Sequence, residues 1–345
     1  MRKSPLISLS LFLSLLLHTI ILADNISFYI KEEIGTDNNI YEANQNPASA
    51  LINQLWGGIK YQNKYDQHFI ALRSKTNYSL YIDHSQENKF VEVLDINHLY
   101  RLNNILLNTS INGFFKKWTG LNRGYNDLGL TESVIWKSRP IGVQFSTSVN
   151  SMKYRNYKLF NNDNFLLALR FNFRSHQDYL YFLSFSEQYA IFPESEFYID
   201  SLNIYQDKKR YDNNFIIRSG IEYSKRFIMG STITYCYNQS NYDYFNNHCL
   251  NLKFYGSWKI KDLLLQLIMQ TQFKKYNNPP TNENVIYDPD PEQNQENKIM
   301  LGLEIPFDEK ISLTSKLAWY HNESTFISQY YDKIMATLGF QYNFK

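Results

Sequence analysis

The chain has 345 residues, of which 17% are aromatic and 20% are charged, and its mean hydropathy is −0.45. The aromatic content excludes a disordered chain, and the negative hydropathy excludes a bundle of membrane-spanning helices. A net charge of +2 gives no reason to expect a nucleic-acid partner, and two cysteines without a Cys-x-x-Cys pair predict no zinc site. A membrane barrel fits this composition, because only every second residue of its strands faces lipid.

The N-terminus has the three parts of a secretory signal peptide. Arg2 and Lys3 form a basic start, residues 6–22 are apolar, and Ala23 is a small residue after which cleavage can occur. We therefore predict a signal peptide at 1–23 and one mature domain at 24–345. The alternative is an uncleaved anchor, because the apolar run approaches the ~18 residues that a spanning helix needs.

The rest of the sequence consists of segments in which every second residue is apolar. In residues 334–344, for example, all even-numbered side chains are apolar, which is typical of a strand with one apolar face. The segments are 25–35, 50–62, 66–80, 88–101, 104–117, 127–137, 141–155, 164–174, 178–190, 213–223, 226–238, 247–258, 261–275, 297–307, 310–321 and 332–344. In 88–101 either face could be the apolar one, because Asp95 interrupts one and His98 the other. The pattern predicts an all-β protein, a transmembrane antiparallel up-and-down β-barrel of about 16 strands, with 14 strands as the alternative.

The connections between these segments alternate in length. Those after even-numbered segments are tight, whereas those after odd-numbered segments are longer on average, especially 191–212 and 276–296. Short turns at one end and long loops at the other are expected of a barrel in the bacterial outer membrane with both termini in the periplasm. The two long connections are the only ones that we expect to be able to fold inward and constrict the barrel.

Basic residues dominate the face that would point into the barrel. If the large apolar residues face lipid, the predicted pore lining comprises Lys60, Arg73, Lys75, Lys116, Arg170, Arg174, Arg218, Lys253 and Lys316. A low-dielectric wall with an excess of one sign of charge favours the opposite ion, so the pattern predicts a mild anion preference. The alternative is that these charges are solvated, or are neutralised by acidic loop residues.

The two cysteines lie on consecutive predicted strands. Cys236 and Cys249 flank the 239–246 loop with the parity of the inner face, so a hairpin could place them opposite each other. The periplasm and cell surface permit disulfides. A cross-strand disulfide is one prediction, and two free thiols one register apart are the other.

The C-terminal residues 337–344 resemble the assembly signal of bacterial outer-membrane β-barrel proteins. Thr337, Gly339, Tyr342 and Phe344 occupy its polar, glycine and two large apolar positions, while Lys345 departs from the commonest form, which ends on the aromatic. The resemblance implies recognition by the barrel-assembly machinery. It covers eight residues and indicates no specific family.

From these features we predict a channel of the bacterial outer membrane, embedded in its lipid, that passes small hydrophilic solutes. A barrel of this size can leave a water-filled lumen. The alternative is a non-transporting barrel that acts as a scaffold, an assembly partner or an exporter of surface proteins. We expect no enzyme activity, cofactor or metal site, since no Ser, His and carboxylate spacing indicates one, and the sequence leaves the oligomeric state open.

Overall fold

The structure, a computed structural model, describes residues 25–41, 47–121, 123–156, 158–175, 178–193, 197–199, 204–206, 209–225, 227–277, 297–322 and 331–344. The barrel strands are β1 (Ile26–Asp37), β2 (Ala50–Tyr65), β3 (His68–Tyr81), β4 (Lys89–Leu102), β5 (Ile105–Trp118), β6 (Gly124–Ser138), β7 (Ile141–Tyr154), β8 (Asn162–Ser175), β9 (Tyr179–Phe192), β12 (Arg210–Ser224), β13 (Phe227–Ser240), β14 (Asn247–Ile260), β15 (Leu263–Tyr276), β16 (Asn297–Pro306), β17 (Ile311–Asn322) and β18 (Tyr331–Phe344). Within the described residues, three single-turn 3-10 helices follow strands: η1 (Ser85–Glu87), η2 (Lys158–Phe160) and η4 (Asp243–Phe245).

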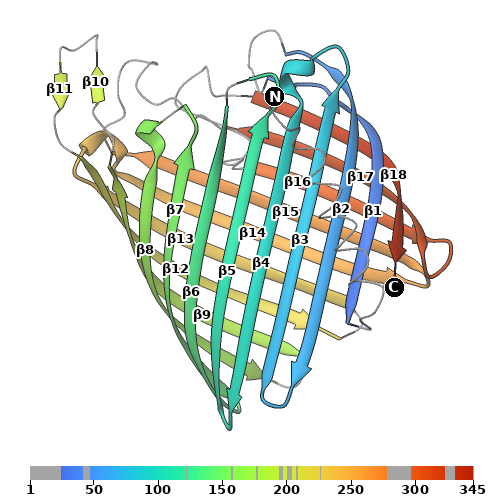
Figure 1. Cartoon of the computed structure of the whole chain (residues 1–345). Helices are drawn as coiled ribbons and strands as arrows, with labels where there is room; N and C mark the ends of the chain where they lie inside the picture. Colours follow the sequence, from blue (N-terminus) through green and yellow to red (C-terminus); the bar gives the residue numbers. More distant parts are fainter. Residues whose placement is uncertain are drawn as a thin grey trace, which may run out of the picture.

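Each barrel strand pairs antiparallel with its neighbours in the chain, and β1 pairs with β18 to close the sheet (Figure 1). The count of sixteen is confirmed, and the alternative of fourteen is wrong. Strand bounds agree with the sequence segments to within about three residues. The connection between β9 and β12 carries two short strands, β10 (Phe197–Ile199) and β11 (Ile204–Gln206), which pair only with each other and which the alternation pattern did not reveal.

The connections segregate by length, as predicted. The connections 66–67, 103–104, 139–140, 176–178, 225–226, 261–262 and 307–310 lie at one end, and all the connections at the other end are longer. At the 307–310 turn, the Asp308 carboxylate accepts hydrogen bonds from the backbone N–H groups of Ile311 and Lys310, both at 2.7 Å. These bonds hold the pKa of that carboxyl below its usual range and fix the tight turn.

Large apolar side chains cover the outer face of the barrel. Ile34, Leu128 and Phe340 are 61%, 62% and 58% exposed, and they share the outer parity with most of the other exposed aliphatic and aromatic residues. In water such a surface would be unstable, whereas in lipid it is the favourable one, and a closed barrel satisfies every backbone group across the hydrocarbon layer. The chain is therefore a transmembrane β-barrel. Among the described residues, no helix is long and apolar enough to cross a membrane.

The pairing register decides which face each residue of the 88–101 segment occupies. Asp95 lies directly opposite Arg73, which pairs in turn with Lys60, so Asp95 faces the interior. His98 has the opposite parity and faces outward. The segment was ambiguous in the sequence because both of its faces carry an ionisable group.

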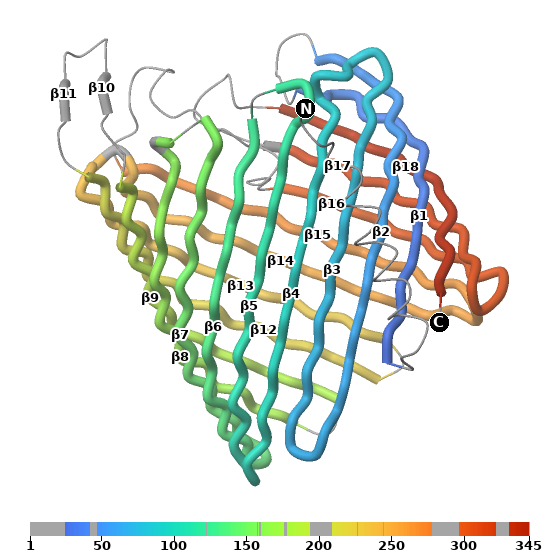
Figure 2. The backbone as a smooth tube through the Cα atoms, in the orientation of Figure 1, coloured from blue at the N-terminus to red at the C-terminus, as the bar shows by residue number. Residues whose placement is uncertain are grey.

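The first and last strands of the barrel meet at the seam between β1 and β18, which run side by side in Figure 2. Phe344 pairs with Phe28, and their rings stack with centroids 4.1 Å apart. Gly339 lies where the two backbones approach closely, since a Cβ there would contact the Glu32 carbonyl oxygen and lie 2.7 Å from Glu33 Cγ. Two of the residues that resemble the assembly signal thus close the barrel.

We expect Gly339→Ala to destabilise the barrel by about 1–3 kcal/mol, because the added methyl group must displace the β1 backbone. Gly57→Ala is the matched control, since a Cβ at Gly57 meets no atom within 4 Å. The stability of both variants is measured by urea unfolding in detergent, with the folded fraction read from the mobility of unheated samples on gels. Equal midpoints for the two variants would show that the seam tolerates a side chain at Gly339.

Candidate functional site

The lumen wall is the candidate site, and the pairing register places all nine predicted basic residues on it. Lys60 pairs with Arg73, Arg170 with Gln144 and Arg218 with Thr234, each pair sharing one face of the sheet. The remaining members of the set follow by the same parity: Lys75, Lys116, Arg174, Lys253 and Lys316. Residues of the opposite parity on these strands, such as Leu169 and Ile217, are exposed on the outer face of the barrel.

Most of these basic side chains make no ion pair with any residue that the structure describes. Arg170 does make one, since its Nη2 lies 3.8 Å from Glu222 Oε1. Those without an ion pair to the described chain are Lys60, Arg73, Lys75, Arg174, Arg218, Lys253 and Lys316. These seven inward-facing cations therefore have no ion-pair partner within the part of the chain that the structure describes.

Arg170 is held by three neighbours on the inner face. Its guanidinium carbon lies 3.9 Å from the Phe182 ring centroid, and its Nε donates a hydrogen bond of 2.9 Å to Asn172 Oδ1. The third neighbour is Glu222. Arg218, two strands away, donates a hydrogen bond of 3.2 Å to Thr234 Oγ1. Fixed guanidinium groups of this kind present their charge at a constant place on the wall.

A buried ion pair spans the seam on the inner face. Lys333 Nζ of β18 lies 3.0 Å from Asp37 Oδ2 of β1, and both side chains are almost completely buried. Asp37 Oδ1 also accepts a hydrogen bond of 3.0 Å from the backbone N–H of Asn39. Sequence reasoning did not select Lys333 or Asp37, although their odd parity on β18 and β1 would have placed them inside.

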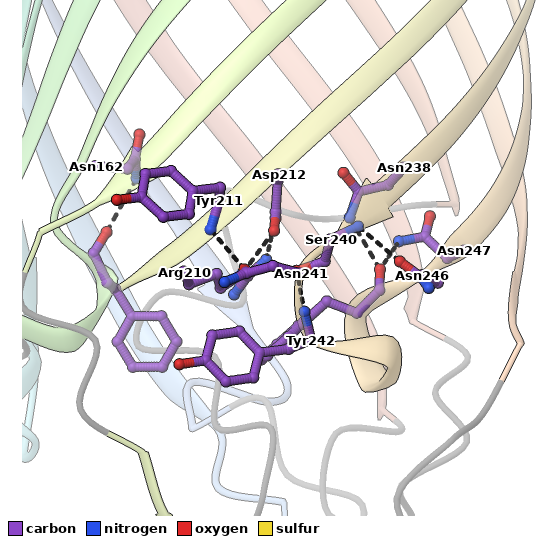
Figure 3. A network of polar contacts seen from close by, with 12 residues as sticks. Asn162, Arg210, Tyr211, Asp212, Asn238, Ser240, Asn241, Tyr242, Asn246 and Asn247 are labelled. Carbon is purple, nitrogen blue, oxygen red and sulfur yellow. Dashed lines mark hydrogen bonds and ion pairs between the residues drawn. The ribbon is translucent and has the colours of Figure 1, made fainter. Parts of the chain in front are cut away.

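A second group that the sequence reasoning missed surrounds Arg210 at the mouth with the long loops (Figure 3). Its guanidinium carbon lies 4.1 Å from the Phe192 ring centroid and 3.5 Å from that of Phe245. It also forms an ion pair with Asp212. The sequence segment began at residue 213, so both charged residues were assigned to a loop, whereas the structure begins β12 at Arg210.

Three of the loops at this mouth close in the same way. In each, an Asn after a 3-10 turn accepts a hydrogen bond from the backbone N–H at the end of the preceding strand. The bonds run from Tyr81 to Asn88 at 2.7 Å, from Tyr154 to Asn161 at 2.7 Å, and from Ser240 to Asn246 at 2.6 Å. Two of these loops share the pattern Asn-Tyr-x-x-Phe-Asn-Asn, at 156–162 and 241–247, a short repeat that the sequence reasoning overlooked.

A polar row interrupts the apolar outer face. His98, Thr109 and Glu132 are cross-strand neighbours with the outward parity, and Thr109 donates a hydrogen bond of 2.8 Å to Glu132 Oε2. His68 Nδ1 lies 3.0 Å from His98 Nε2. The spacing of residues in the sequence had suggested no cluster of histidine and carboxylate side chains on this face. These residues lie on four different strands, and only the pairing register shows that they are neighbours. The described residues include no group of three or more His, Cys, Asp or Glu side chains that could hold a metal ion.

Cys236 and Cys249 lie directly opposite each other in the β13–β14 pairing, so the predicted register is confirmed. Both are free thiols in this structure, and the predicted bridge is absent from it. Cys249 Sγ instead accepts a hydrogen bond of 2.7 Å from Gln272 Nε2. Register alone does not oxidise two thiols, since that depends on the redox conditions in the compartment.

We expect the pair to form a disulfide when the protein is isolated from an oxidising envelope, because the two residues are directly cross-strand. Labelling of the denatured, unreduced protein with a maleimide measures this. No label before reduction and two labels after it are expected. Two reactive thiols before reduction would contradict the bridge.

Several features named from the sequence lie outside the described residues. These are the predicted signal peptide at 1–23, most of the 276–296 connection and residue Lys345. Of the 191–212 connection, β10 and β11 are described, and they form a two-stranded sheet separate from the barrel.

No family model matches the sequence, and no curated protein matches it. Solved structures that resemble the fold include CdiB from Acinetobacter baumannii, at 9% identity and a TM-score of 0.47, covering 93% of this chain and 60% of that one. A bacterial polysaccharide outer membrane secretin matches at 10% identity and a TM-score of 0.46, covering 93% and 99%. A loop deletion mutant of OmpT, an outer membrane protein of Vibrio cholerae, matches at 10% sequence identity and a TM-score of 0.46. The match covers 92% of this chain and 99% of that one. At these values the likeness is one of barrel architecture, and it carries no argument about function.

Proposed function

We propose that the barrel is an outer-membrane channel that passes small hydrophilic solutes with a mild preference for anions. The observation that carries the proposal is the set of seven inward-facing basic side chains, among them Arg174, Arg218 and Lys253, that make no ion pair within the described chain. A single sign of fixed charge on a low-dielectric wall raises the local concentration of the opposite ion.

The size of the barrel supports a water-filled path. About eight strands enclose only enough space for side chains, whereas 16 to 18 leave an aqueous channel. The chain closes with sixteen.

The outer face and the C-terminal strand support a location in the bacterial outer membrane. An apolar exterior requires lipid, and closed barrels of this type belong to the bacterial outer membrane. In this proposal residues 1–23 direct export, and the barrel-assembly machinery recognises β18 through Thr337, Gly339, Tyr342 and Phe344. The proposal assigns the barrel no catalytic step and leaves its oligomeric state open.

Permeation into vesicles tests the proposal. Refolded protein in liposomes is placed in iso-osmotic arabinose, sodium gluconate or lysine chloride, and swelling is followed by light scattering. We expect arabinose and gluconate to enter faster than lysine, with no swelling of protein-free vesicles. A barrel that is folded by gel mobility and causes no swelling would contradict a channel.

The second candidate is a non-transporting scaffold or exporter, and one observation favours it. Several inner-face side chains near the long-loop end are buried, including Tyr81, Lys116, Tyr320 and Lys333. This packing narrows the lumen along β2–β5, β17 and β18. A folded barrel without permeation would favour this candidate.

A further inference from the structure

A cavity opens on the inner face near the long-loop end, between β2–β6 on one side and β17–β18 on the other. Its volume is about 480 Å³, within the ~300–1,000 Å³ typical of small-molecule sites. Its wall combines two kinds of side chain that channels for simple ions do not need together: aromatic rings and lysines. The lining includes Trp56, Tyr81, Lys89, Lys116, Tyr125 and Lys316.

Four lysines, Lys89, Lys116, Lys316 and Lys333, line the cavity, and Lys333 is paired with Asp37. Lys89 Nζ lies 5.2 Å from the Tyr81 ring centroid, and Lys116 Nζ lies 4.3 Å from that of Trp118. An aromatic ring holds an ammonium group in place without cancelling its charge. Lys316 makes no ion pair with any described residue, and Asp127 is the one carboxylate among the cavity's described lining residues. Like charges around one space repel each other, and a bound anion relieves that repulsion.

The rest of the wall suits a sugar ring. Trp56 is partly exposed, and a flat aromatic surface packs against the C–H face of a pyranose. Gln54, Asn77 and Ser79 add amide and hydroxyl groups that match sugar hydroxyls. An inorganic anion would gain nothing from the aromatic surface, and a neutral sugar would gain nothing from the lysines.

We propose that this cavity is a binding subsite for an acidic saccharide, one that carries carboxylate groups on pyranose rings. The inference rests on the proposed channel function and names the class of solute that the channel selects. In this proposal Trp56 packs against the pyranose ring, while Lys316, Lys89 and Lys116 attract the carboxylates.

Isothermal titration of the folded barrel in detergent tests the subsite without requiring conduction. The probes are tri-galacturonate, the neutral trisaccharide maltotriose and inorganic phosphate. We expect tri-galacturonate to bind at least about tenfold more tightly than either of the other two. Equal binding of phosphate and tri-galacturonate would overturn the saccharide assignment, and no detectable binding of tri-galacturonate would overturn the site.

Two variants and two controls locate the binding. Trp56→Ala and Lys316→Gln should each weaken tri-galacturonate binding by about tenfold or more. Trp319→Ala and Lys275→Gln change the same residue types on the outer parity and should leave it unchanged. Gel mobility of unheated samples confirms that each variant is folded. An effect of the outer variants equal to that of the inner ones would overturn the location.

The two proposals fail in different ways. Conductance in a planar bilayer without tri-galacturonate binding in detergent overturns the subsite and leaves the channel. Binding without conductance overturns the channel and leaves a saccharide-binding barrel.

Discussion

Reversing the charges of Arg174 and Arg218 to Glu should turn an anion-preferring channel into a cation-preferring one. Both side chains face the lumen, and neither has an acidic partner in the described chain, so reversal creates no new repulsive pair there. Arg170 is less suitable, because Glu222 lies 3.8 Å away and a Glu at 170 would repel it. The measurement is the zero-current potential in a salt gradient, and we expect its sign to invert while single-channel conductance changes by less than about twofold.

The matched control reverses two charges on the outer parity. Lys117 and Lys275 directly follow the inward-facing Lys116 and Lys274 on β5 and β15. Lys117→Glu with Lys275→Glu therefore changes net charge by the same amount without altering the lumen wall. A similar potential shift in both double variants would show that overall charge, and not the lumen face, determines selectivity.

Replacing Lys333 by Ala should destabilise the barrel by about 3–5 kcal/mol, because it leaves the Asp37 carboxylate buried beside the seam without its cation. Urea unfolding in detergent or lipid vesicles measures the loss. Asp37→Asn in the same chain should restore much of it, since an uncharged amide tolerates burial better than a carboxylate.

The control is an ion pair of the same type and length at the surface. Lys153 Nζ lies 3.0 Å from Asp163 Oδ1, but these side chains are 46% and 51% exposed. Lys153→Ala should therefore cost no more than about 1 kcal/mol. If Lys333→Ala cost equally little, the seam pair would be accessible to water and would not close the barrel.

The sequence was sufficient to predict the barrel because strand parity is a local property. In residues 334–344 every second side chain is apolar, and the structure forms β18 over a range that contains them. β10 and β11 were not predicted, since three residues are too few to show a period of two. The 88–101 segment remained ambiguous because Asp95 and His98 have opposite parity, and only pairing with Arg73 decides between the faces.

The candidate site was predicted as a set of residues on one face, but not as an arrangement. Parity placed Arg170 inside, whereas its contact with Phe182 depends on a residue of the next strand. The seam pair of Asp37 and Lys333 joins strands that are nearly the whole chain apart. Arg210 was missed because β12 begins with mostly polar residues, which show no alternation of apolar side chains.

The most direct test of a basic, open lumen is the single-channel current of the refolded protein in a planar bilayer under a salt gradient. We predict stable conductance steps and a zero-current potential displaced toward the equilibrium potential of the anion. A barrel that is folded by gel mobility and gives no steps, or one whose potential is displaced toward the cation, would contradict the account.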